Sequence, residues 1–182
     1  MNSLSKYEDV LYSILKKLET FNVEYAEARF HSIKELAAIL QNGEPKPTIS
    51  IEKQGIGIRL IYDGVLVFAS TNMFDDSINE LIEKTIMKAK SSKKISKSQI
   101  KFSPEKSNKK EWSAIEKDNL KNIHVDDMIS VLKEVDGYIT SFNSDISLPN
   151  RTLILDNSVE EKFYVNTDGT HLLSHVPRVS FH

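Results

Sequence analysis

With 182 residues, 40% of them hydrophobic, the chain can form one domain with a sizeable core. Its formal charge of −2 gives no overall field that would draw nucleic acid or an anionic membrane. It has no cysteine, which excludes disulfides and thiolate metal sites in these residues and fits a reducing cytoplasm. The N-terminal residues lack the apolar core of a signal peptide, and no run approaches the roughly 20 apolar residues of a membrane span. We therefore expect a cytoplasmic protein without a membrane partner.

The first predicted elements are a helix and a strand. Apolar side chains recur at the helical period in residues 7–18, at Tyr7, Val10, Leu11, Ile14, Leu15 and Leu18. Residues 24–31 alternate instead, which predicts a half-buried strand. One face of this strand carries Ala26, Ala28 and Phe30, and the other carries Tyr25, Glu27, Arg29 and His31.

Residues 34–45 have two possible interpretations. Their leucines suit a helix. Their position between two strands and their closing Asn42-Gly43 pair suit a strand that ends in a turn.

Residues 47–70 carry the strongest β signal. Ile49 and Ile51 lie at odd-numbered positions, whereas Ile56 and Ile58 lie at even-numbered positions. The side of the strand that faces inward therefore switches near Gln54-Gly55. A β-bulge would produce this switch. Asp63-Gly64 suits a type I′ turn, since both central positions need a positive φ. Gly55 and Gly57 do not predict a phosphate loop, because Leu60 stands where the dinucleotide motif needs a third glycine.

Two further helices and a second group of strands are predicted. One helix is capped by Asp75, Asp76 or Ser77, and its buried stripe is Ile78, Leu81, Ile82, Ile86 and Ala89. The other covers about residues 124–135, with Met128, Val131, Leu132 and Val135 inward and Gly137 as its C′ residue. After residue 150, two or three strands surround an Asp168-Gly169 turn.

The stretch between these helices, residues 91–111, is rich in lysine, at positions 93, 94, 97, 101, 106, 109 and 110. We expect an exposed connection. A nucleic-acid-binding stretch is the alternative. It has no arginine and a single aromatic residue, Phe102, so the paired hydrogen bonds and base stacking of nucleic-acid readers are missing. We therefore do not expect nucleic acid as a partner.

The element order predicts an α+β fold, in which helices flank a mainly antiparallel sheet. We expect one domain over residues 1–182. It comprises a helix-sheet-helix core at 1–90, the connection at 91–111, and a helix plus β-hairpin at 112–182. The sequence ends inside a strand pattern, which predicts a truncated chain.

Metal and catalytic patterns in the sequence are weak. His171 and His175 have a spacing that could share a metal on a helix, but in a strand they lie about 13 Å apart. Ser70 lacks the glycine frame of a nucleophile elbow. The acidic pairs 75–76, 126–127 and 160–161 lie at helix starts or in exposed positions, where capping explains the first two better than acid–base work does. We predict no catalytic, metal-binding or cofactor-binding residue in this chain.

Five segments in order resemble the N-terminal domain of the TldD/PmbA family: residues 25–30, 40–44, 55–72, 77–92 and the turn at 165–170. Members of this family are named modulators of DNA gyrase and are regarded as zinc metalloproteases. They are much longer, and their catalytic members carry His-Glu-x-x-x-His and a later cysteine. Neither feature occurs here, so no catalytic residue is carried over.

The resemblance implies a noncatalytic N-terminal domain of a metallopeptidase, or of its noncatalytic partner subunit. Zinc, if the parent protein is catalytic, would lie in the missing C-terminal part. The implied partners are a second family subunit, in a homo- or heterodimer, and an unstructured peptide held extended in a channel between them. The alternative is a stand-alone module that binds DNA, a topoisomerase or another protein. A complete small enzyme ranks last, because no titratable side chains cluster in the sequence.

Overall fold

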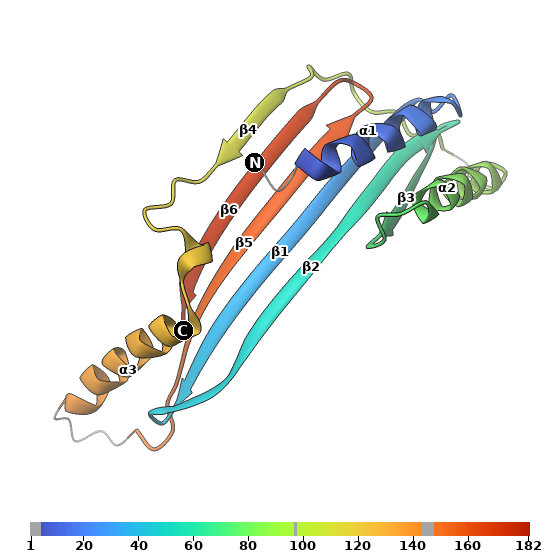
Figure 1. Cartoon of the computed structure of the whole chain (residues 1–182). Coiled ribbons are helices and arrows are strands. Elements are labelled where there is room, and N and C mark those ends of the chain that lie inside the picture. Colours follow the sequence, from blue (N-terminus) through green and yellow to red (C-terminus); the bar gives the residue numbers. More distant parts are fainter. Residues whose placement is uncertain (1–4, 97, 143–147) are drawn as a thin grey trace. The chain divides into compact units, whose positions relative to one another are not determined.

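The computed structural model describes residues 5–96, 98–142 and 148–182, so Lys97 of the lysine-rich stretch lies outside the described residues. The described residues form a six-stranded sheet of order β3-β2-β1-β5-β6-β4 with three α-helices (Figure 1). The strands are β1 (Tyr25–Gln41), β2 (Glu44–Tyr62), β3 (Val65–Thr71), β4 (Lys109–Ser113), β5 (Thr152–Asn166) and β6 (His171–Phe181). The predicted α+β class is confirmed.

The helices are α1 (Ser5–Glu19), α2 (Ser77–Lys93) and α3 (Val125–Ser141), with a short 3-10 helix at Leu120–Asn122. No α-helix in the described part of the chain is long and apolar enough to cross a membrane. Tertiary contacts divide the chain into two compact units. The first unit contains residues up to 32, residues 54–113 and residues 161–175, and the second contains residues 33–53, 114–160 and 176–182.

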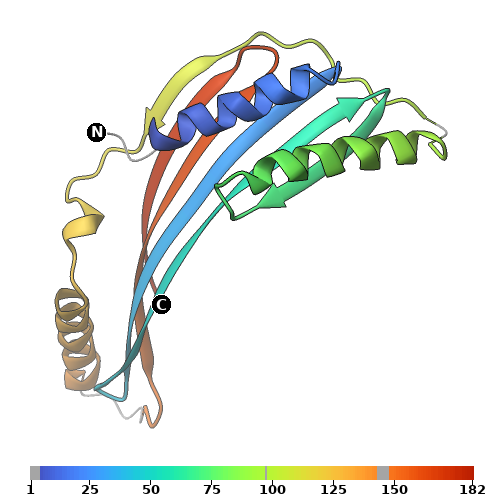
Figure 2. The same cartoon turned by 45° about the vertical axis from the view of Figure 1, so that its right-hand side comes forward.

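In the first unit, α1 and α2 lie on the same face of the sheet (Figure 2). Their apolar stripes pack on inward-facing strand residues, and the fully buried members include Leu11, Ile14, Ile82, Ile86, Phe30, Ile58 and Phe163. Ala26 and Ala28 are completely buried, as the alternation in residues 24–31 predicted. Each large apolar side chain buried in this way contributes about 1.5–3 kcal/mol.

The β2–β3 hairpin turns at Asp63-Gly64 with φ angles of 53° and 72°, and Tyr62 pairs with Val65. The predicted type I′ turn is therefore confirmed. The recorded β2–β3 pairs begin at Ile56, and the bulge expected just before it stays a prediction. Ile49, expected to face inward, is exposed.

In the second unit, residues 34–41 continue β1, which resolves the ambiguity in favour of a strand. Asn42-Gly43 turns with positive φ at both positions. The core here contains Ala38, Leu40, Met128, Leu132 and Leu153.

Two expectations about the third helix were wrong. Gly137 lies inside α3, which continues to Ser141. A helical glycine costs only about 1 kcal/mol relative to alanine, and the packing of Ile139 against the core outweighs that cost. Val131, expected to be inward, is 46% exposed, because Met128 and Leu132 occupy the stripe that faces the core.

Both ends of the lysine-rich stretch, residues 91–111, belong to regular secondary structure. The helix α2 runs to Lys93, and β4 begins at Lys109 and pairs in parallel with β6. After residue 150 the described chain forms two long strands, β5 and β6, joined by a turn in which Gly169 has a φ of 87°.

Candidate functional site

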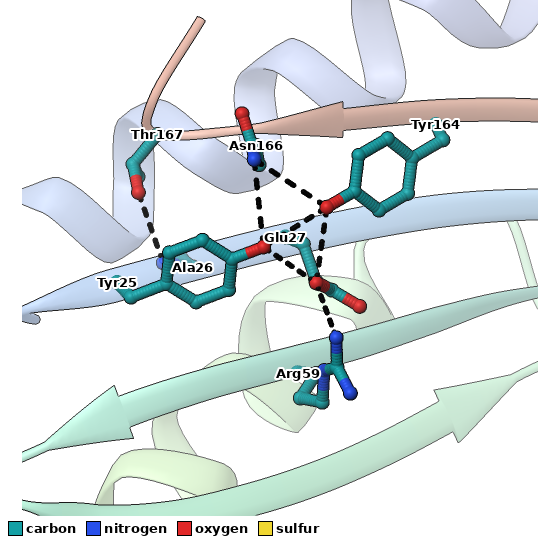
Figure 3. Close-up of polar contacts among 7 residues, drawn as sticks. All are labelled: Tyr25, Ala26, Glu27, Arg59, Tyr164, Asn166 and Thr167. Atoms are coloured by element: carbon teal, nitrogen blue, oxygen red, sulfur yellow. Dashed lines mark hydrogen bonds and ion pairs between the residues drawn. The ribbon is translucent and has the colours of Figure 1, made fainter. Parts of the chain in front are cut away.

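A cluster of polar side chains lies on the face of the sheet opposite α1 and α2, within the first unit (Figure 3). Because side chains alternate across a strand, the neighbours of buried Ala26, Phe163 and Val165 point to this second face. The cluster, called the Tyr-Glu cluster below, consists of Tyr25 and Glu27 of β1, Arg59 of β2, and Tyr164 and Asn166 of β5.

Glu27 is the centre of the Tyr-Glu cluster. Its Oε2 accepts hydrogen bonds from the Tyr25 hydroxyl at 2.6 Å and the Tyr164 hydroxyl at 3.1 Å. Arg59 Nη2 donates to the same oxygen at 2.8 Å. The Glu27 side chain is only 14% exposed, so these three donors compensate for the loss of water around a carboxylate.

Asn166 connects the Tyr-Glu cluster to the β5–β6 turn. Its Nδ2 lies 3.4 Å from both tyrosine hydroxyls, and its Oδ1 accepts a hydrogen bond from Thr170 N at 2.8 Å. Thr167 extends the connection to β1, because its N–H donates to Ala26 O and its Oγ1 accepts from Ala26 N. The turn motif at residues 165–170 therefore has a structural role in fixing β5 beside β1.

Both phenols are protonated at neutral pH, and their surroundings favour the protonated form further. Burial raises the pKa of Tyr25, and the hydrogen bond to Glu27 raises it further. Burial also raises the pKa of Tyr164, with a further contribution from its hydrogen bond to Tyr25. The hydrogen bond to Glu27 raises the pKa of Arg59. Tyr25 and Tyr164 therefore act as hydrogen-bond donors and are poorly suited to act as bases.

A hollow of about 530 Å³ adjoins the cluster. Tyr25, Arg59 and Tyr164 line it from the sheet, and Phe102 and Lys106 line it from the lysine-rich stretch. The Phe102 ring meets Tyr25 edge-on at 4.9 Å, and the Arg59 guanidinium lies 5.3 Å from the Phe102 centroid. The described lining residues include no histidine or cysteine, and their hydroxyl, amide and charged side chains suit polar binding.

The two histidines weighed in the sequence lie in β6, as the strand pattern predicted. His171 Nδ1 lies 2.9 Å from the Tyr12 hydroxyl, and His175 Nδ1 lies 3.2 Å from Glu161 Oε1. Both rings are half-buried. Among the described residues, no group of three histidine, cysteine, aspartate or glutamate side chains could hold a metal ion.

The other residues weighed in the sequence lie apart from the Tyr-Glu cluster. Ser70 is exposed on β3. Asp75 Oδ1 accepts from Ser77 N at 2.9 Å, and Asp127 Oδ2 accepts from His124 N at 3.1 Å. Asp75 therefore accepts from the first N–H of α2, whose N-cap residue Asp76 makes no side-chain cap hydrogen bond, and Asp127 completes a capping box with His124. In the third pair, Glu160 binds Arg178 at 3.1 Å.

The sequence placed Tyr25 and Glu27 on the outer face of their strand but did not indicate their partners. Arg59 and Tyr164 also occupy outward positions in strand patterns, which is a usable signal for the face. Nothing in a single sequence shows that β2, β1 and β5 are neighbours in the sheet and bring together residues that are far apart along the chain.

A second feature is an open edge of β2 in the second unit. Pairing between β2 and β3 covers only residues 56–62 of β2, so residues 44–53 have no strand on that side among the described residues (Figure 1). Pro45 and Pro47 lack N–H donors, which blocks pairing near the Asn42-Gly43 turn. Residues 48–53 contain no proline, and their side chains are mostly exposed.

Residues 26–90 match the family model described as PmbA/TldA metallopeptidase domain 1. No curated protein matches the chain. The solved structures that are similar in fold include three proteins. They are a candidate modulator of DNA gyrase from Thermotoga maritima (16% identity, TM-score 0.66, 98% of this chain and 39% of that chain), another from Bacteroides thetaiotaomicron (13%, 0.76, 97% and 40%), and TldE from Thermococcus kodakarensis (18%, 0.70, 93% and 37%).

The chain thus spans about two fifths of the length of these solved proteins. The sequence match covers β1, β2, β3 and most of α2, and the structural match covers nearly all of the chain. The resemblance to the N-terminal domain of the TldD/PmbA family, expected from five short segments of the sequence, is confirmed.

Proposed function

We propose that the chain is the noncatalytic N-terminal domain of a TldD/PmbA-type metallopeptidase, or of its noncatalytic partner subunit. It would act in proteolysis of unstructured peptides, in the cytoplasm, beside a second family subunit. The match to metallopeptidase domain 1 supports this function. The described residues offer no set of metal ligands, so they do not fit a zinc ion, and we place any zinc of the parent protein outside this chain.

The observation that carries a role in peptide binding is the open edge at residues 48–53 of β2. An extended peptide can add to such an edge through its own main-chain N–H and C=O groups, which every residue possesses. Recognition of this kind suits substrates that share an unfolded state and differ in sequence. The two prolines before the edge would confine the added strand to residues 48–53 and away from the turn.

Hydrogen exchange tests the proposal in the full-length protein with its partner subunit. An unstructured peptide should slow amide exchange in residues 48–53, whereas residues 56–62, which already have strands on both sides, should change little. A version of the same peptide with N-methylated amides is the matched control, since it cannot donate main-chain hydrogen bonds and should not protect the edge. Unchanged exchange in residues 48–53 with the unmodified peptide would contradict the proposal.

A further inference from the structure

The hollow beside the Tyr-Glu cluster lies wholly within the first unit. One wall is the sheet, and the other is the segment 102–108, called the strap below. The strap is held at both ends. At one end the Phe102 ring meets Tyr25 edge-on, and at the other end Asn108 O accepts a hydrogen bond from His171 N at 2.8 Å. These contacts fix the two walls of the hollow relative to each other.

The hollow is elongated, because it crosses four neighbouring strands. Its lining includes Arg59 of β2, Tyr25 of β1, Tyr164 of β5 and Leu172 of β6, and these strands are consecutive in the sheet. Three spacings between strands amount to about 14 Å. The volume of about 530 Å³ lies within the usual range of small-ligand pockets, roughly 300–1,000 Å³. The hollow therefore suits an extended ligand that reaches across the strands.

Arg59 provides a positive charge with unused donors at the β2 end of the hollow. Its Nη2 donates to Glu27 (Figure 3), but its Nε and Nη1 have no acceptor among the described residues. A guanidinium has five N–H groups, and pairs of them bind the two oxygens of a carboxylate. The β2 end of the hollow can therefore bind a carboxylate without breaking the bond to Glu27.

Negative charge is in excess at the opposite end, near the β5–β6 turn. Asp168 lies in this turn, and Glu105 and Lys106 lie in the strap. Ser107 Cβ lies 3.8 Å from the position of an added Cβ on Gly169, which places this part of the strap at the turn. Within the described part of the chain, the side chains of Asp168, Glu105 and Lys106 form no ion pair. Two carboxylates beside one ammonium group can accept a second ammonium group from a ligand.

The lining between the two ends is uncharged and polar. It includes the hydroxyls of Tyr25, Tyr164 and Thr170 and the amide of Asn166. Such groups can exchange hydrogen bonds with the N–H and C=O groups of a peptide. The order of the groups is therefore cation, neutral polar groups, then excess negative charge, which complements a peptide whose two termini are both charged.

We propose that the hollow binds a short peptide of about three residues with both termini free, since an extended peptide of this length spans about 10 Å. Its α-carboxylate would pair with Arg59, and its α-ammonium with Asp168 and Glu105. A free amino acid carries both charges on one Cα and cannot reach both ends. The inference goes beyond the proposed function, because the open edge of β2 belongs to the second unit and requires no free terminus.

Trialanine is a suitable probe, because its termini are its only charges. Calorimetric titration of the full-length protein compares it with N-acetyl-trialanine, trialanine amide and free alanine. We expect trialanine to bind, and each blocked peptide to bind at least about threefold more weakly because one ion pair is lost. Alanine should bind more weakly than any of the peptides. Equal affinity for free and blocked peptides, equal affinity for alanine, or no binding of trialanine would overturn the inference and leave the hydrogen-exchange test of β2 unaffected.

A double variant, Glu105→Gln with Asp168→Asn, tests the location of the site. Both substitutions keep the size of an exposed side chain and remove its charge. N-acetylation should then no longer weaken binding, whereas C-amidation should still do so. The matched control is Glu111→Gln with Asp118→Asn, which removes two exposed carboxylates that do not line the hollow. An acetylation effect that persists in the first variant, or disappears equally in the control, would contradict binding in this hollow.

Discussion

Arg59 donates from Nη2 to Glu27 Oε2 over 2.8 Å, and this ion pair joins the neighbouring strands β2 and β1. The Arg59 side chain is 44% exposed, whereas Glu27 is nearly enclosed. The carboxylate therefore depends on the protein for its hydrogen bonds, and the guanidinium retains access to water. Loss of the Glu27 charge should therefore lower the free energy of unfolding more than loss of an exposed ion pair would.

We predict that Glu27→Gln lowers the free energy of unfolding by about 1–2 kcal/mol, because three hydrogen bonds lose their charged acceptor while the side chain keeps its shape. Urea unfolding at neutral pH measures the change. Glu80→Gln is the matched control, since Glu80 pairs with Lys84 on the exposed surface of α2 and its removal should have no measurable effect. Equal effects of the two substitutions would show that Glu27 is not the centre of the cluster.

The tyrosines of the Tyr-Glu cluster predict a loss of stability at alkaline pH. The pKa values of Tyr25 and Tyr164 are raised in the folded chain, chiefly by burial, so the folded state holds these protons more tightly than the unfolded state. Their contribution is complete below the unfolded pKa of about 10 and falls as pH rises above it. Urea midpoints measured from about pH 9 upward should decline, and less steeply in a Tyr25→Phe, Tyr164→Phe double variant.

A second ion pair, in the other unit, predicts the opposite pH dependence. Asp136 of α3 accepts hydrogen bonds from Arg151 Nε and Nη2, the latter at 2.9 Å. These bonds lower the pKa of Asp136. A lowered carboxyl pKa gives stability that is present above the unfolded value of about 4 and lost as pH falls below it. The stability difference between the native chain and Asp136→Asn should therefore shrink on acidification, and a difference that persists in acid would contradict this account.

Local patterns in the sequence predicted the features that local chemistry decides. Asp63-Gly64 indicated its turn because few other residue pairs adopt two consecutive positive φ angles. The alternation around Ala26 and Ala28 separated the core face of β1 from the face that carries Glu27. Each of these inferences needs only neighbouring residues.

Features that depend on distant residues could not be predicted in the same way. The partners of Glu27 lie 32 and 137 residues away in the sequence, at Arg59 and Tyr164. The strand β4 is short and exposed throughout, so no alternation marks it. The end of α3 was misplaced because the contacts of Asp136 and Ile139 favour continuing the helix through Gly137, against the local preference of glycine.

Two glycines in different backbone conformations test whether α3 continues through Gly137. Gly137 lies inside α3 with no atom within 4 Å of an added Cβ, so Gly137→Ala should stabilise the chain by about 0.5–1 kcal/mol through helix propensity. Gly64 has a φ of 72°, and an added Cβ would lie 2.9 Å from Gln99 Cβ and Cγ. We expect Gly64→Ala to cost at least about 1–2 kcal/mol. In thermal and urea unfolding, the midpoint of Gly137→Ala should rise and that of Gly64→Ala should fall. A destabilised Gly137→Ala would mean that the helix does not continue through that position.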